Sequence, residues 1–128
     1  MKASVESVVR ISSCELSAHD IQELVNLQAN RLVEPKDGEG TGESRFILSG
    51  EISEHESVEA HLAGLCSVLD TVQEKLALLP SEAEIDIWCT IYNEGEFVGF
   101  SIEKDILSNL AQLGVNLVFS YYEHSNSD

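Results

Sequence analysis

Residues 84–92 read EIDIWCTIY, and apolar side chains alternate with other side chains along the whole stretch. One face carries Ile85, Ile87, Cys89 and Ile91, and the opposite face carries Asp86, Trp88, Thr90 and Tyr92. A period of two residues is typical of a β-strand that packs one face on a core. The turn residues NEGE follow at 93–96 and lead into FVGFSI. We therefore predict a β-hairpin at this point of the chain.

The longest periodic signal precedes this strand and has the spacing of a helix. Its apolar residues recur at intervals of four and three, at Val58, Leu62, Leu65, Leu69, Val72 and Leu76. Such a stripe predicts one helix that packs on the sheet and ends at Leu79–Pro80. Too few heptads are present to favour a coiled coil.

Further strands and helices lie on both sides of this pair. Alternating patterns predict strands at 5–12, 45–52 and 115–122, and helical patterns follow Ser17 and Ser101. The first of these helices is expected to end near Ala29–Arg31, and Gly114 suits the end of the second. The resulting order is β-α-β-α-β-β-α-β. It predicts one α+β domain over residues 1–128, with a mostly antiparallel sheet of about five strands and helices on one face.

Glycines alternate in DGEGTGES, residues 37–44, which raises the question of a phosphate-binding loop. Such loops present backbone N–H groups at a helix N-terminus, usually with a lysine behind them. Here a strand follows instead of a helix, the known motif spacings are not matched, and acidic residues lie inside the stretch. We interpret residues 35–44 as a flexible connector and residues 123–128 as a frayed tail.

The charge balance restricts the classes of partner. The chain of 128 residues carries 23 Asp and Glu against 7 Lys and Arg, a formal net charge of −16. Such a surface repels nucleic acid and anionic membranes, and it attracts a basic protein. The alternative is that the acidity only keeps the domain soluble. No apolar stretch approaches the roughly 20 residues needed to span a bilayer. Three widely spaced cysteines fit a reducing cytoplasm better than a disulfide framework.

No catalytic, cofactor or metal site is predicted. His55 and His61 are six residues apart, which does not bring them onto one helical face as a zinc pair requires. Cys66 and Cys89 fall on apolar faces and are expected to be core residues, whereas Cys14 lacks a legible partner base. With this many acids, a pair of carboxylates arises easily by chance and carries little weight.

A candidate binding face lies opposite the aliphatic face of residues 84–92. If helices cover only the aliphatic side, aromatic and acidic side chains remain on the other side. The predicted partner-binding residues are Asp86, Trp88, Tyr92, Glu94, Glu96 and Tyr122. Aromatic side chains beside carboxylates suit an interface with a basic protein. The alternative is that Trp88 fills a second small core under the glycine-rich connector.

The order of motifs resembles the bacterial family catalogued as domain of unknown function 4279. The resemblance rests on LSAHDIQELV, the glycine-rich connector, RFILSG, SVEAHLAGLCSVLD and ILSNLAQLGVNLVFSYY. The last motif, a leucine-rich turn into a strand that ends in tyrosines, is the most specific, and the match covers most of the chain. The resemblance implies the fold and a bacterial origin, and it supplies no catalytic residues.

Three hypotheses on function remain open at this point. The first is a cytoplasmic, acidic protein-binding domain that acts as an immunity protein against a basic, nuclease-like toxin. Small size, strong acidity and the lack of a catalytic motif motivate it. The second is a small-molecule or regulatory binding domain with a pocket between sheet and helices. The third is an enzyme that uses carboxylates or a cysteine.

Overall fold

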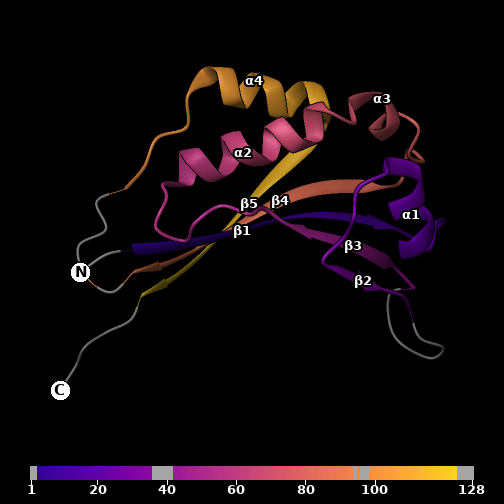
Figure 1. The fold of residues 1–128 in the computed structure, drawn as a ribbon, viewed down its shortest axis with the longest axis horizontal. Helices are drawn as coiled ribbons and strands as arrows, with labels where there is room; N and C mark the ends of the chain where they lie inside the picture. The colour runs from indigo at the N-terminus through magenta and orange to yellow at the C-terminus, as the bar shows by residue number, and fades with distance from the viewer. Residues whose placement is uncertain (1–2, 36–41, 94, 96–98, 124–128) are drawn as a thin grey trace.

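Five strands form one sheet in the spatial order β2-β3-β1-β4-β5, and helices pack against one of its faces (Figure 1). The computed structural model describes residues 3–35, 42–93, 95 and 99–123. In chain order the elements are β1 (Ala3–Ser13), α1 (Ala18–Val25), β2 (Arg31–Val33), β3 (Ser44–Ser49), α2 (Val58–Asp70), α3 (Gln73–Leu76), β4 (Glu84–Asn93), α4 (Lys104–Leu113) and β5 (Val115–Glu123). The predicted α+β class with a mostly antiparallel sheet is confirmed.

The predicted hairpin after residue 93 is wrong. β4 pairs with β1 in antiparallel register and with β5 in parallel register, so both of its edges are occupied. The described residues 99–103 have no strand conformation, and α4 makes the crossover between the two parallel strands. The second neighbour of β4 is therefore β5, Val115–Glu123, and not residues 99–102. Parallel strands cannot be joined by a tight turn, so the chain between β4 and β5 makes a crossover that includes α4.

The long apolar stripe is confirmed as core, but it spans two helices and not one. α2 ends at Asp70 and α3 begins at Gln73. Between them Thr71 and Val72 are β-branched and have low helix propensity, and the Thr71 hydroxyl donates to the Val68 carbonyl at 2.6 Å. All six stripe residues are nevertheless buried.

The end of the first helix and the short strand β2 also differ from the prediction. α1 begins after the predicted cap Ser17, whose side chain accepts from the Asp20 N–H, but it ends already at Val25. Asn26 adopts the left-handed conformation, with φ 58°, and stops the helix there. The chain then turns into β2, a three-residue edge strand too short to show a period.

One hydrophobic core lies between the helices and the sheet. Phe46 from β3 and Ile87 from β4 are fully buried in it, as are Ile21 and Val25 from α1. The second and fourth helices lie above the same face in Figure 1, so all the helices cover one side of the sheet.

The two cysteines expected in the core are there. Cys66 and Cys89 are buried, whereas Cys14 is exposed. Burial raises the pKa of the Cys89 thiol to about 11. Little reactive thiolate is therefore present on Cys89 at neutral pH.

Glu82 holds the end of β1, and this contact has a testable pH dependence. Its carboxylate accepts from the Cys14 N–H and from the Ser13 hydroxyl, both at 2.7 Å. The Cys14 N–H and then the Ser13 hydroxyl lower the pKa of Glu82 below its ordinary 4.5. Because the folded pKa is the lower one, this stabilisation is present above about pH 4.5 and is lost as the pH falls through the folded pKa.

We expect Glu82→Gln to flatten the acid limb of the stability profile. Urea unfolding from pH 3 to pH 7 checks this, and the Glu82 carboxyl should titrate below 4.5 by NMR. An unchanged acid limb, or a carboxyl that titrates at or above its ordinary value, would contradict the contact.

Candidate functional site

The face of the sheet turned away from the helices, here called the open face, gathers the candidate binding residues. Register places Trp88 between Val8 and Val118, and Tyr92 beside Tyr122. The aromatic and charged members of the open face are Glu6, Arg10, Arg31, Arg45, Glu84, Asp86, Trp88, Tyr92 and Tyr122. Four of the six predicted binding residues are thus brought together, Asp86, Trp88, Tyr92 and Tyr122. The other two, Glu94 and Glu96, lie outside the described residues.

Tyr92 and Tyr122 are exposed aromatic residues of this face. Their rings stack with centroids 5.5 Å apart and planes inclined by 16°, and they are 40% and 58% exposed. Neighbouring Glu6, which also hydrogen-bonds the hydroxyl, raises the pKa of Tyr92. The stack therefore presents two aromatic rings with a carboxylate beside them, a combination that protein interfaces favour.

Asp86 and Trp88 are less accessible than the tyrosines. Arg10 lies over the Trp88 ring, with its guanidinium carbon 4.4 Å from the centroid. Arg10 Nη2 also lies 3.6 Å from an Asp86 oxygen, and Asn116 donates to the other oxygen at 3.2 Å. Asp86 is thus paired within the chain, and Trp88 is half-buried beneath Arg10. Asp86 and Trp88 therefore stabilise the sheet through contacts within the chain and are less available to a partner than the two tyrosines.

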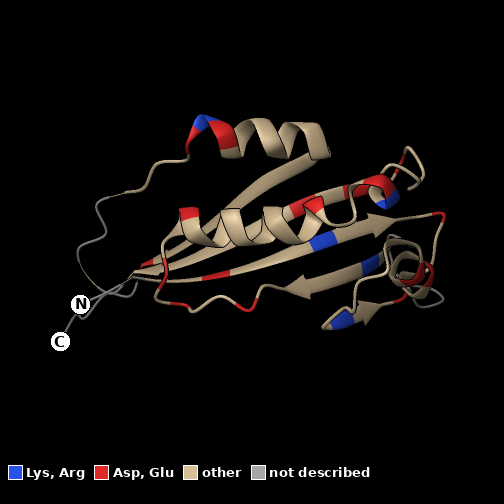
Figure 2. Ribbon diagram, turned by 45° about the horizontal axis from the view of Figure 1, so that its top comes forward, with Lys and Arg blue, Asp and Glu red and all other residues tan. Residues whose placement is uncertain are grey.

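All three arginines of this acidic chain lie on the open face. Arg10, Arg45 and Arg31 occupy the neighbouring strands β1, β3 and β2, where Figure 2 shows them in blue. The open face therefore has an arginine half toward β2 and an aromatic half toward β5. We define the aromatic half by Glu6, Trp88, Tyr92 and Tyr122. The arginine half was not predicted, because it requires the register of three strands that are distant in sequence.

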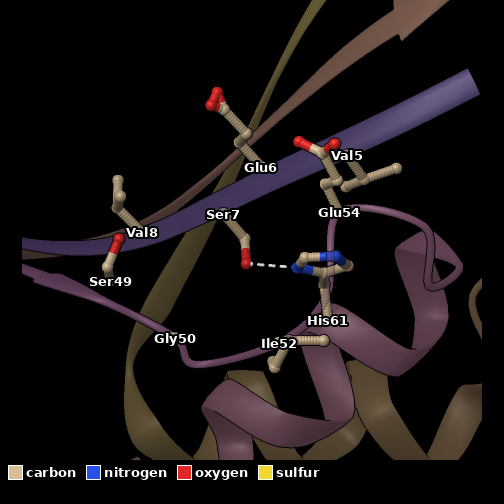
Figure 3. A pocket seen from close by; sticks show the side chains of 9 residues that line it. All are labelled: Val5, Glu6, Ser7, Val8, Ser49, Gly50, Ile52, Glu54 and His61. Carbon is tan, nitrogen blue, oxygen red and sulfur yellow. Dashed lines mark hydrogen bonds between the residues drawn. The ribbon is translucent and has the colours of Figure 1, made fainter.

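A pocket of about 330 Å³ opens beside the start of β1 (Figure 3). β3 pairs only with residues 8–13 of β1, and beyond that point an irregular segment passes along the strand instead. The Val5 N–H donates to the Glu54 carbonyl at 2.8 Å and holds this segment in place. The lining residues are Val5, Glu6, Ser7, Val8, Ser49, Gly50, Ile52, Glu54 and His61.

Ser7 and His61 form a buried hydrogen-bonded pair in this pocket. His61 Nδ1 lies 2.6 Å from the Ser7 hydroxyl oxygen (Figure 3). On the other side of the ring, Nε2 lies 3.0 Å from the Ser53 carbonyl oxygen. A carbonyl can only accept, so Nε2 carries the proton, and in the neutral ring Nδ1 accepts the proton of Ser7. The pair links β1 to α2.

The sequence contains a signal for this pair at two polar positions within apolar patterns. Ser7 interrupts the apolar face of β1 between Val5 and Val9, and His61 lies next to Leu62 of the apolar stripe. Buried polar side chains require hydrogen-bond partners, so two polar residues at core positions are candidates to bond each other. The Ser–His contact is also that of an activated nucleophile. Here, however, Ser7 and His61 are only 6% and 2% exposed, and both ring nitrogens are held by hydrogen bonds within the fold.

We expect Ser7→Ala and His61→Leu each to lower the free energy of unfolding by about 1–3 kcal/mol, because each leaves a buried partner without its hydrogen bond. The double variant should cost less than the sum of the two single variants, since both partners are then removed together. Urea denaturation of all four proteins measures this coupling. Strict additivity would show that the contact contributes nothing.

No group of three His, Cys, Asp or Glu able to hold a metal ion occurs among the described residues. His55 Nε2 lies 3.7 Å from a Glu54 oxygen on the surface. A search of the described helices for a membrane span finds none of sufficient length and apolar character.

The family model described as a domain of unknown function (DUF4279) matches residues 4–124, and the chain belongs to this family. Neither the curated proteins nor the solved structures contain a significant match.

Proposed function

We propose that this DUF4279 domain is a protein-binding domain that takes a basic protein partner on the aromatic half of its open face. The exposed Tyr92–Tyr122 stack beside Glu6 is the observation that supports this most directly. Tyrosine is enriched among the residues that dominate binding energy, because it buries a large area at little entropic cost.

The charge of the chain supports a basic partner. A net charge of −16 creates a field that speeds the approach of a cationic protein and slows that of an anionic one. On the open face, Arg31 and Arg45 lie on the arginine half, and Arg10, which lies over Trp88, is paired with Asp86. Within the open face, a basic partner therefore meets the least positive charge at Glu6, Tyr92 and Tyr122.

Within this class, we propose a bacterial, cytoplasmic immunity protein that neutralises a nuclease-like toxin. Nucleases that bind phosphate backbones are often basic, and an acidic domain of this size can cover such a surface. The proposal rests on charge, size and the open face, and it involves no catalytic step.

A second candidate is a small-molecule binding domain, and one cavity favours it. A pocket of about 410 Å³ lies between the chain at 27–30, the end of β3 and α2, and this volume lies in the range of ligand sites. A saturable thermal shift with a metabolite collection, lost in Val68→Trp, would favour this candidate over the first.

Partner capture followed by kinetics tests the protein-binding proposal. We expect a protein of high isoelectric point, with an association rate that falls at least about tenfold between low and physiological salt. For the immunity reading, co-expression of the domain should restore growth to cells that produce the partner. An acidic partner, or an association rate independent of salt, would contradict the electrostatic part. A partner without toxicity would contradict the immunity part.

A further inference from the structure

We propose that the pocket beside the start of β1 receives one lysine or arginine side chain of the basic partner. This inference rests on the proposed function and names the chemical group that anchors the partner. Three properties of the pocket support it: its hydrogen-bonding groups, its apolar walls and its position beside the aromatic half.

The side chains of the pocket accept hydrogen bonds and hardly donate them. Ser7 donates its hydroxyl proton to His61 Nδ1, and both nitrogens of His61 are occupied, so neither side chain offers a donor to a ligand. The Glu54 side chain is 61% exposed and lies at the mouth of the pocket near Val5 (Figure 3). Carboxylates accept only, which leaves the Ser49 hydroxyl as the remaining side-chain donor. A pocket whose side-chain acceptors outnumber its donors suits an ammonium or guanidinium group, which donates only.

The apolar walls suit the aliphatic part of the same side chain. Val5, Val8 and Ile52 line the pocket together with the polar groups. Lysine and arginine bury their methylene stems against such surfaces while the charged end stays beside polar groups. The volume of about 330 Å³ exceeds one long side chain, so a water molecule can accompany it.

Close packing of the irregular segment against α2 shapes the pocket. A side-chain carbon on Gly64 would lie 2.5 Å from Ile52 Cδ1, and one on Gly50 would lie 3.0 Å from Leu65 Cδ2. The two glycines therefore allow Ile52 to lie against α2 as one wall of the pocket.

The pocket and the aromatic half share β1. Glu6 and Val8 line the pocket and also lie on the open face, and Glu6 contacts Tyr92. A partner resting on the tyrosine stack can therefore extend one basic side chain into the pocket.

Amide chemical shifts measured during titration with a small cation test the pocket without any partner. The probes are agmatine and n-pentylamine, with n-pentanol and pentanoate as neutral and anionic controls. We expect saturable shifts confined to residues such as Ser7, Val8, Gly50 and Ile52, with Kd of about 1–30 mM. Glu54→Gln should weaken agmatine binding about fivefold, as for an exposed charge pair, whereas Glu74→Gln on α3 should change it less than twofold.

The outcomes separate this inference from the proposed function. Shifts spread over the acidic surface, or equal effects of Glu54→Gln and Glu74→Gln, would contradict the binding of a cation in the pocket. If a basic partner binds wild type and Glu54→Gln equally well, the proposed function is supported, and the proposal that the pocket anchors the partner is contradicted. If agmatine binds the pocket and no basic partner is found, cation binding in the pocket is supported, and the proposed function is contradicted.

Discussion

Replacing Leu65 with alanine is expected to lower the free energy of unfolding by roughly 2–5 kcal/mol. Leu65 is fully buried in α2, in the single core between the helices and the sheet. The substitution removes methyl and methylene groups and leaves a cavity, because a close-packed core relaxes only in part. Leu62→Ala and Leu69→Ala should behave alike, since both residues are also fully buried. Urea denaturation measures all three.

Leu78→Ala is the matched control. This leucine follows α3 and is 70% exposed, so its loss should change stability by less than about 0.5 kcal/mol. If all three buried variants lost under about 1 kcal/mol, the stripe of α2 would not be the centre of the core.

The double variant Tyr92→Ala/Tyr122→Ala is expected to weaken partner binding at least about thirtyfold, which corresponds to about 2 kcal/mol. Both rings are exposed and stacked, so they are available to a partner at little cost to the fold. The loss should appear mainly as faster dissociation, because anchor residues act after the encounter. Surface plasmon resonance with the captured partner separates the two rate constants.

Tyr121→Ala is the control for this variant. Tyr121 is the neighbour of Tyr122 on β5 and is 49% exposed, but it lies on the helix side of the strand, where its hydroxyl accepts from Asn93 Nδ2 at 2.9 Å. It should leave the dissociation rate within about twofold. Trp88 is a poorer choice, because its loss also removes the contact with Arg10 and so disturbs the fold. Equal increases in the dissociation rate for Tyr121→Ala and for the double variant would mean that the partner does not bind the open face specifically.

The order of the strand and helix patterns predicted the fold class, and the alternation of β4 and the stripe of α2 were its clearest parts because both patterns report burial directly. The hairpin after Asn93 could not be excluded from sequence, because a short apolar run gives no information on which strand occupies the neighbouring edge. β2 was missed for a related reason. Three residues do not show a period, and the edge position comes from pairing with β3.

The candidate binding residues of the open face were predictable from sequence only where they lie on one strand. Trp88 and Tyr92 follow from the period of β4 alone, and Tyr122 from the period of β5. The Ser7–His61 pair joins residues 54 positions apart, and the arginine half needs three strands in register. Long-range pairing of this kind depends on tertiary structure and leaves only a faint local signal, a polar residue at an apolar position.

Amide chemical-shift mapping of the isotope-labelled domain with its bound partner shows which face of the sheet the partner covers. We expect the largest changes at the open-face positions of β1, β4 and β5, above all at Glu6, Tyr92 and Tyr122, and at Ser7 and Gly50 of the pocket. Changes concentrated on the outer surfaces of α2 and α4, with the open face unaffected, would contradict this expectation.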